Sequence, residues 1–149
     1  MKIRDVMTTP VVSVTPDTYY ADAARLMHEH ALASLVVLDK MGSLVGILSE
    51  KDLFRALYPK YREFYRTPHA VFDEEQYEAT VEDLREKPVR TFMTTEILSI
   101  GPDEPIMKAG GLMLAHHIHL LPVLDDEKFL GVVSRENVFG AVLKSHLGF

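Results

Sequence analysis

The sequence predicts an α/β (α+β) fold built from two similar units, each with the order strand, helix, strand, strand, helix. The first observation is an internal repeat, because the stretch Leu44–Asp52 (LVGILSEKD) returns as Phe129–Asn137 (FLGVVSREN). The second is that residue types before these stretches match at an offset of 86, which becomes 85 after the turn at residues 40–43. Matches at a nearly constant offset over this many positions indicate an internal duplication. The third is that apolar runs of strand length alternate in each copy with apolar residues at helical spacing.

The duplication divides the 149-residue chain into a first repeat at residues 1–57, a connector at 58–88 and a second repeat at 89–149. Each copy has roughly 55 residues, a size at which a lone domain is marginally stable. We therefore expect the two copies to share a core.

The composition is that of a soluble globular protein, with 47% hydrophobic and 26% charged residues. No run approaches the roughly 18 consecutive apolar residues of a membrane span. The N-terminus has no apolar signal region, so we expect a cytoplasmic protein without a membrane partner. The net charge of −6 gives no overall attraction for nucleic acid, and we expect none as a partner. The absence of cysteine excludes disulfides, thiolate metal sites and a cysteine nucleophile.

The first half of each repeat has the pattern of a strand followed by a helix. In the first copy, residues 11–14 (VVSV) are β-branched enough for a strand that ends at Thr15 and Pro16. Asp17 or Thr18 is then placed to cap a helix. The apolar face of this helix has residues three and four apart, namely Tyr20, Ala23, Ala24 and Met27.

The second half of each repeat has the pattern of a hairpin followed by a helix. In the first copy, strands at Ser34–Leu38 and Leu44–Leu48 flank a turn at Asp39–Ser43 that contains Gly42. A helical stretch at Leu53–Leu57 follows the second strand. Each unit therefore ends in a strand-to-helix corner.

The connector has no counterpart in the repeat and differs from it in composition. Residues 73–86 contain seven acids and a single base. Asp73 and Gln76 resemble a capping box for a helix predicted at Glu74–Glu86, which Pro88 ends. The apolar stripe of this helix consists of Tyr77, Val81 and Leu84. The helix either packs over the repeats with a solvated acidic face or is a docking surface for a partner.

Two features distinguish the second copy. Its first helix contains Gly110 and Gly111, which cost about 1 kcal/mol each relative to alanine. Either a backbone or a ligand approaches closely there, or the helix is a poor one. The histidines His116, His117 and His119 precede a strand, but their spacing does not point three imidazoles inward and no nearby acid orients them. We therefore expect no metal site.

The strand-to-helix corners carry the candidate chemistry. Ser49 and Asp52 in the first copy, and Ser134 and Asn137 in the second, bring a hydroxyl and a carboxylate or amide to the free N–H groups of a helix start. Such a corner can hold a ribose and its phosphate. The alternative is that each pair only caps its helix.

With these residues in place, the chain resembles a tandem pair of cystathionine-β-synthase (CBS) domains, called a CBS pair or Bateman module. The matching residues are the starts of the two repeats, the two Pro-Asp corners, one strand and the two signatures: Val6-Met7-Thr8, Phe92-Met93-Thr94, Pro16-Asp17, Pro102-Asp103, residues 121–125, Gly46-Ile47-Leu48-Ser49 and Gly131-Val132-Val133-Ser134. These matches cover nearly everything outside residues 58–88.

The resemblance implies two β-α-β-β-α CBS units that are related by a pseudo-two-fold axis and packed through their sheets. It also implies clefts that in many members bind AMP, ADP, ATP or S-adenosylmethionine as a regulatory ligand, with no cofactor required. A third implication is a homodimer. Helical apolar residues are the candidates for its interface: Met27, Met113, Leu53, Leu57, Val138 and Val142.

The resemblance also assigns ligand-binding positions. It implies that Asp52 holds the ribose hydroxyls, with Ser49 beside the ribose or phosphate, and that Ser134 and Asn137 are their counterparts. The positions implied to contact adenine are Val11, Val12, Ser34 and Leu35 in the first copy, and Ile97, Leu98, Leu120 and Pro122 in the second. The nearest candidates for phosphate contacts are Lys51, Arg135 and His119. Because Asn137 replaces the acid, we expect the two clefts to be unequal.

We therefore predict a regulatory module that senses an adenosine nucleotide in the cleft between two CBS repeats and acts on an unknown regulated protein. The alternative is a ligand-free module for dimerisation and protein interaction. We expect no enzyme activity and assign no catalytic residue, because no nucleophile motif, phosphate loop or acid–base pair is placed by the sequence.

Overall fold

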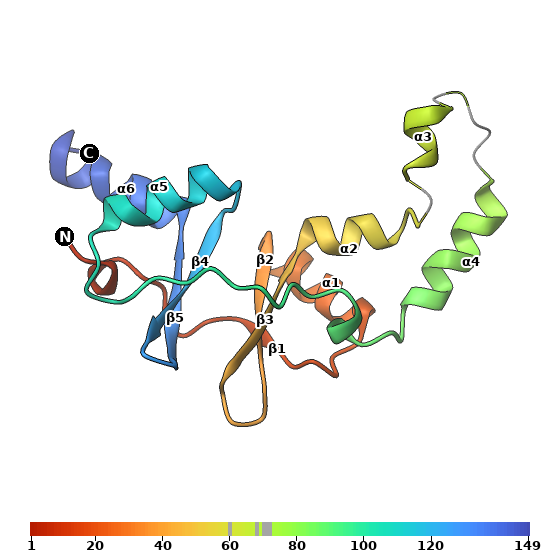
Figure 1. The fold of residues 1–149 in the computed structure, drawn as a ribbon, viewed down its shortest axis with the longest axis horizontal. Coiled ribbons are helices and arrows are strands. Elements are labelled where there is room, and N and C mark those ends of the chain that lie inside the picture. The colour runs from red at the N-terminus through yellow and green to blue at the C-terminus, as the bar shows by residue number, and fades with distance from the viewer. Residues whose placement is uncertain (60, 68, 70–72) are drawn as a thin grey trace. The chain divides into compact units, whose positions relative to one another are not determined.

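The computed structural model describes residues 1–59, 61–67, 69 and 73–149, and the fold is α+β (Figure 1). The elements in chain order are η1 (Ile3–Asp5, a 3-10 turn), β1 (Ser13–Val14), α1 (Tyr20–Glu29), β2 (Ser34–Leu38), β3 (Leu44–Ser49), α2 (Glu50–Ala56), α3 (Glu63–Arg66), α4 (Glu74–Leu84), η2 (Val89–Thr91, a 3-10 turn), α5 (Ile106–His116), β4 (Leu120–Asp125), β5 (Lys128–Ser134) and α6 (Arg135–His146). Within the described ranges no helix combines the length and apolar character needed to cross a bilayer.

The chain forms two compact units, and each is assembled from separated segments. Unit 1 consists of Met1–Ser13, Asp39–Leu44 and Glu96–Phe149. Unit 2 consists of Val14–Leu38 and Val45–Thr95. Each unit thus combines the start of one repeat with most of the other. We call residues 1–13 and 89–95 the leading segments of the first and second repeat.

The core of unit 1 is built on the β4–β5 hairpin and helices α5 and α6. β4 pairs antiparallel with β5, beginning with Leu120 opposite Ser134. Ile3, from the leading segment of the first repeat, is 0% exposed in this core. The other buried members of the cluster are Ile100, Ile106, Ala109, Met113, Leu121, Val123, Val133, Val138 and Ala141.

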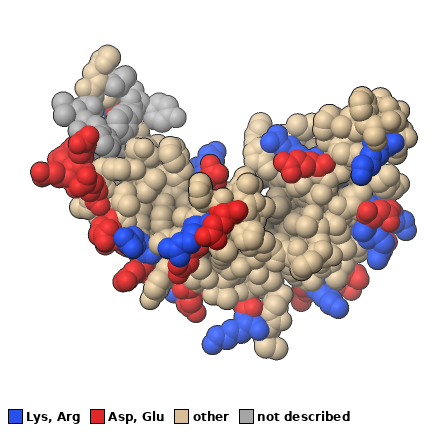
Figure 2. All heavy atoms as spheres, turned by 180° about the vertical axis from the view of Figure 1, so that it is seen from behind, with Lys and Arg blue, Asp and Glu red and all other residues tan. Residues whose placement is uncertain are grey.

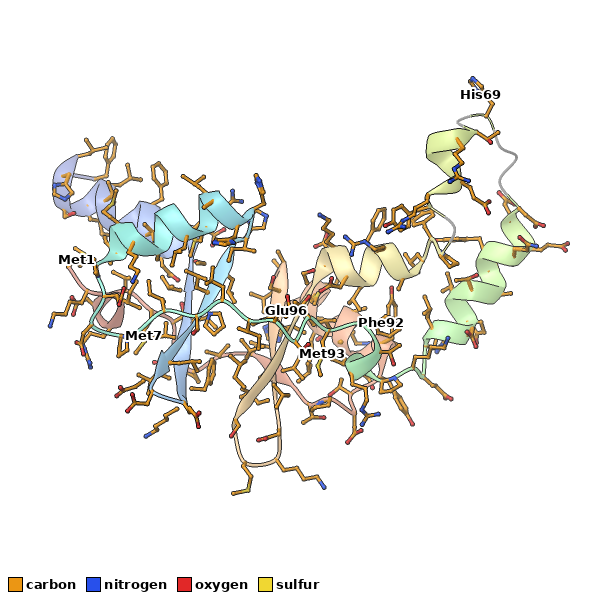
Figure 3. All side chains as sticks on the ribbon, in the orientation of Figure 1. Met1, Met7, His69, Phe92, Met93 and Glu96 are labelled. Atoms are coloured by element: carbon orange, nitrogen blue, oxygen red, sulfur yellow. The ribbon has the colours of Figure 1, made fainter. Side chains whose placement is uncertain are left out.

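In unit 2 the leading segment of the second repeat packs on the helices of the first. Strands β1, β2 and β3 form a sheet in that order, and residues 35–37 of β2 are at most 1% exposed. Tyr20 of α1 donates its hydroxyl to the backbone carbonyl of Leu53 at 2.6 Å. The Tyr20 ring meets the edge of Phe92, a leading-segment residue labelled in Figure 3, at a centroid distance of 5.3 Å. Burial raises the pKa of Tyr20 above its ordinary value.

The two leading segments make matching backbone contacts in their separate units. The N–H of Ile3 donates to the carbonyl of Glu104 at 2.9 Å in unit 1. At the equivalent position of unit 2, the N–H of Val89 donates to the carbonyl of Thr18 at 2.8 Å. The duplication therefore extends to the hydrogen bonds that hold each leading segment.

Each leading segment also pairs with the strand that precedes a strand-to-helix corner. In unit 1, Thr8 and Val132 exchange two N–H···O=C bonds, of 2.8 and 3.3 Å. In unit 2, Thr94 and Ile47 exchange bonds of 2.8 and 3.0 Å. The corner strands β5 and β3 are thus fixed in place by residues of the other repeat.

Equivalent ion pairs accompany these contacts. Arg4 pairs with Asp103 at 2.8 Å, and Arg90 pairs with Asp17. The hydrogen bond from Arg4 holds the pKa of Asp103 below its ordinary value. Because the four side chains are about half exposed or more, solvent screens both pairs and they contribute little to stability.

Most predicted elements are confirmed, with small shifts at their ends. β2 has the predicted bounds, and β3 extends one residue further, to Ser49. α4 begins at Glu74 as predicted and is capped by the Asp73 carboxylate, but it ends at Leu84, two residues before the predicted end.

The connector helix also has the predicted faces. Leu84 is buried in unit 2, whereas Tyr77 and Val81 are half-buried. The acids of α4 are exposed, and Figure 2 shows Asp and Glu side chains gathered beside the grey residues, on the part of the surface that α4 forms. The predicted packed stripe and exposed acidic face are therefore both present, as either of the two alternatives requires.

The predicted cap of α1 is wrong. Neither Asp17 nor Thr18 caps the helix, whose N-cap residue is Tyr19 without a side-chain bond. The Thr18 hydroxyl accepts instead from the N–H of Thr15 at 3.0 Å, and Asp17 pairs with Arg90. Both side chains therefore stabilise the turn and the leading segment rather than the helix start.

The first strand of each repeat is shorter than its sequence suggests. In the first repeat, only Ser13–Val14 of residues 11–14 form a strand. In the second, the described structure reduces this strand to one parallel bridge between Ile100 and Val123. The β-branched residues at these positions are not sufficient for a longer strand, because a strand also needs a neighbouring strand with which it can form hydrogen bonds along its length.

Most of the residues predicted for a dimer interface are buried in their own units. Met27, Leu53, Met113 and Val138 belong to the cores and cannot contact another chain. Among the described side chains, the large apolar ones that the helices expose are Phe54, Phe139, Met107 and Leu114. The helices were predicted correctly, but residues of their buried faces were mistaken for residues of their exposed faces.

Two glycines allow the leading segments to approach the corner strands. A Cβ at Gly131 of β5 would lie 2.6 Å from the backbone oxygen of Thr8. A Cβ at Gly46 of β3 would lie 2.6 Å from the sulfur of Met93, which is labelled in Figure 3. A backbone oxygen cannot move away as a flexible side chain can, so Gly131 is the stricter requirement.

The glycine pair of α5 is different. A Cβ at Gly110 would lie 3.6 Å from Val138, an ordinary contact distance, and a Cβ at Gly111 meets no described atom within 4 Å. Neither contact in unit 1 requires glycine. Among the described residues, therefore, no backbone in unit 1 approaches this glycine pair closely.

We predict that Gly131→Ala lowers the free energy of unfolding by about 1–3 kcal/mol, because the added methyl forces the Thr8 backbone away from β5. Gly46→Ala is expected to cost less, since Met93 can change rotamer. Gly140→Ala is the matched control: a Cβ there, in α6, would meet no described atom outside the neighbouring helix backbone within 4 Å, and alanine should stabilise by up to about 1 kcal/mol. Urea denaturation measures all three, and equal values for Gly131→Ala and Gly140→Ala would contradict the close approach.

Candidate functional site

The first corner lies in unit 2, where β3 runs into α2. The Ser49 hydroxyl accepts from the N–H of Asp52 at 3.1 Å, and the Asp52 carboxylate accepts from the N–H of Ser49 at 3.0 Å. The N–H of Glu50 donates to the carbonyl of Ala33 at 2.8 Å, which ties the corner to the residue before β2. The corner is therefore a complete capping box.

The second corner lies in unit 1 and has the same design. The Ser134 hydroxyl accepts from the N–H of Asn137 at 3.2 Å, and the Asn137 side-chain oxygen accepts from the N–H of Ser134 at 2.8 Å. The N–H of Arg135 donates to the carbonyl of His119 at 3.1 Å. The capping role that the sequence left open is thus realised in both copies.

The two corners differ in what they leave for a ligand. The Oδ1 atom of Asn137 lies within hydrogen-bonding distance of both the N–H and the hydroxyl of Ser134, at 2.8 and 3.0 Å. Asp52 uses only Oδ2, and its Oδ1 has no hydrogen-bond partner among the described residues. The first corner therefore keeps an ionised acceptor, whereas the acceptor of the second is occupied.

A cavity of about 520 Å³ in unit 2 borders Asp52. It runs along α2 and is open to solvent, and the connector and the second leading segment contribute to its walls. Its lining consists of Asp52, Arg55, Ala56, Tyr58, Pro59, Tyr61, Thr80, Asp83, Leu84, Lys87 and Phe92. This volume lies within the roughly 300–1,000 Å³ that is typical of small-molecule sites.

The charges around the cavity are only partly neutralised. Lys87 pairs with Asp83 at 2.9 Å. Arg55 has no ion pair or side-chain hydrogen bond among the residues that the structure describes. A hydrogen bond from Arg62 lowers the pKa of Tyr61, and the charge of Arg55 lowers it further. An available cation and an available carboxylate oxygen thus border the same cavity.

The structure distributes the predicted site residues between the two units. Unit 2 contains Ser34, Leu35, Ser49, Lys51 and Asp52. Of these, Ser49 and Asp52 are in direct contact, and Leu35 is buried.

Unit 1 contains the remaining predicted residues: Val11, Val12, Ile97, Leu98, His119, Leu120, Pro122, Ser134, Arg135 and Asn137. Ser134 contacts Asn137, and Arg135 contacts His119 through backbone groups. Pro122 is buried, and its carbonyl accepts from the N–H of Ile100 at 3.0 Å.

The sequence analysis missed the cavity along α2. Much of its lining comes from the connector, which has no counterpart in the repeat, so the two copies could not be compared there. One signal was present: Arg55 of the first repeat corresponds to Gly140 of the second at the offset of 85. A charged residue that is present in only one of the two copies indicates that the two corners differ in function.

Comparisons with known proteins agree with this architecture. The CBS domain family matches the sequence twice, over residues 3–59 and 89–144. Protein MJ1426 of Methanocaldococcus jannaschii is 30% identical over 155 residues, which cover 96% of this chain and 92% of that protein.

Two solved structures are similar over almost the whole chain. CBSX2 from Arabidopsis thaliana is 27% identical with a TM-score of 0.77, covering 99% of this chain and 98% of its own. A crystal structure of CBSX2 in complex with AMP is 27% identical with a TM-score of 0.74, covering 96% of both chains. The repeated match and these likenesses show that the chain belongs to the CBS domain family and is a tandem CBS pair.

Proposed function

We propose that this CBS pair is a regulatory module that binds an adenosine nucleotide and has no catalytic activity of its own. The observation that carries the proposal is the unoccupied Oδ1 of Asp52 at a capped corner beside a cavity. The AMP complex of the similar protein CBSX2 supports the adenosine part of the ligand.

The chemistry of the first corner suits a ribose. The capping box already satisfies the N–H groups of Ser49 and Asp52, so the corner is rigid before a ligand arrives. The remaining carboxylate oxygen can accept from the ribose hydroxyls, and charge-assisted bonds of this kind contribute roughly 1.5–3 kcal/mol. Of the adenine positions predicted for this corner, Ser34 and Leu35 lie in the same unit as Asp52, and neither lines its cavity.

A second candidate function is a ligand-free module for dimerisation and protein interaction. The exposed apolar side chains Phe54 and Phe139, at equivalent positions of α2 and α6, favour it. The two functions are separated by a thermal-shift screen with AMP, ADP, ATP and S-adenosylmethionine. A ligand that binds only the folded state raises the melting temperature, and a flat response to all four supports the second candidate.

We predict that the two clefts bind AMP unequally and that Asp52 serves the tighter one. Asp52→Asn should weaken this event about tenfold, because a neutral amide replaces a charged acceptor. The substitution keeps the cap, since Asn137 forms the same capping box in the second copy. Asp52→Ala should remove the tight event, and Asn137→Ala should change it little. Isothermal titration with AMP measures each case.

The opposite pattern would overturn this assignment. If Asn137→Ala abolishes tight binding while both Asp52 variants keep it, Ser49 and Asp52 form only a helix cap. Denaturation curves of the four proteins provide the control, because Asp52→Asn should leave the free energy of unfolding nearly unchanged.

We predict a homodimer that uses the exposed helical residues Phe139 and Phe54. Phe139→Glu should shift sedimentation at micromolar concentration toward monomer, because a charge replaces a large apolar contact. Met41→Glu is a matched control, since Met41 is even more exposed but lies in the β2–β3 turn. A wild-type protein that sediments only as monomer would exclude the dimer.

A further inference from the structure

We propose that helix α4 of the connector is a strap that a ligand bound at the first corner holds against α2. This inference rests on the proposed function, because it takes a nucleotide at Asp52 as its starting point. It goes further in naming the element of the chain that responds when the nucleotide binds. The connector has no counterpart in the repeat, so this response belongs to the first corner.

The first observation is that two helices contribute to the walls of the cavity beside Asp52. The lining residues from these helices are Asp52, Arg55 and Ala56 of α2 and Thr80, Asp83 and Leu84 of α4. A volume of about 520 Å³ is large enough for a nucleotide. A ligand that fills the cavity therefore contacts α4 as well as α2.

The second observation is that α4 is anchored at its C-terminal end. Leu84 is buried in unit 2. The N–H of Tyr20 donates to the carbonyl of Lys87 at 2.8 Å, and the N–H of Ala21 donates to the carbonyl of Arg85 at 3.2 Å. These bonds join the start of α1 to the residues that follow α4. The last turn of the strap is therefore fixed, and any movement of the helix would pivot about this end.

The N-terminal part of α4 is held more weakly. Glu74, Glu75 and Glu78 are exposed, along with most other residues of these turns. Tyr77 reaches toward the end of α2, where its ring lies 5.9 Å from that of Tyr58. Segments with few buried apolar side chains open at a lower free-energy cost than the core does. A ligand that joins α4 to α2 would therefore stabilise a part of unit 2 that opens easily.

The polar groups of the two walls suit a single ligand. Asp52 keeps Oδ1 without a hydrogen-bond partner among the described residues. The Thr80 hydroxyl donates to the carbonyl of Gln76 at 2.9 Å, so its oxygen can still accept a hydrogen bond. A nucleoside has hydroxyl donors on its ribose and an amino donor on adenine. One ligand can therefore bind an acceptor of α2 and an acceptor of α4.

Thermodynamic linkage gives the consequence for the connector. If the ligand binds tightly only when α4 lies against α2, bound ligand must suppress the opening of α4 by the same factor. Occupancy of the first corner is thereby converted into a change in the order of α4, whose acids face solvent. The strap is the route by which unit 2 presents its ligand state at its surface.

The test is hydrogen–deuterium exchange of the full chain, read by mass spectrometry, with AMP at about twenty times the Kd found by titration. AMP should slow amide exchange in residues 74–84 by about threefold or more, with an upper limit of about twentyfold. Thr80→Val keeps the shape of the side chain but removes its hydroxyl. It should weaken AMP binding about fivefold, which is the effect of one lost hydrogen bond.

Glu78→Gln is the matched control, because Glu78 is an exposed residue of α4 that does not line the cavity. This variant should keep both the affinity for AMP and the protection of α4. If Thr80→Val and Glu78→Gln have equal effects on the affinity, α4 does not contact the ligand. If AMP binds in titration while exchange in residues 74–84 stays the same, the proposed function stands and only the strap falls. If AMP does not bind to the wild-type protein, both fall together.

Discussion

The fold depends on the close backbone approach between each leading segment and a corner strand. In unit 1 the backbone oxygen of Thr8 lies so close to Gly131 that a Cβ atom at this position would clash with it. The paired hydrogen bonds of Thr8 with Val132 fix the end of β5, and β5 carries the corner. Thr94 and Ile47 do the same for β3 in unit 2. The position of each candidate site therefore depends on a segment that belongs to the other repeat.

Much of the fold could be predicted from the sequence, because most elements occur in both copies and their patterns can be compared. The hairpin at Ser34–Ser49 and the cap at Asp73 follow from local patterns and were found. The packing of the leading segments could not be predicted, because Ile3 and Val89 are short apolar signals whose partners lie far away in the chain. Hydrophobic periodicity also fails to show which face of a helix is covered, as Met27 and Phe54 illustrate.

The candidate site was partly predictable for a related reason. Ser49 and Asp52 recur at matched positions, so the repeat identified their corner, and local geometry explains the capping box. Arg55 and Lys87 line a cavity to which the unrepeated connector contributes much of the wall, and no sequence pattern links these two residues. Asp52 in the first copy and Asn137 in the second both form the capping box of their helix. Only the aspartate also has a charged oxygen that a ligand could use. One copy could therefore lose the charge without losing its helix.

The exchange of leading segments has a consequence for the order of folding during synthesis. Every residue of unit 2 has been made once the ribosome reaches Thr95, so this unit can form while the second repeat is still incomplete. Residues 1–13 are made before unit 2 but belong to unit 1, which also needs residues 96–149. They must therefore wait for this later segment before they can pack. The corner that contains Asp52 would be assembled before unit 1 is complete.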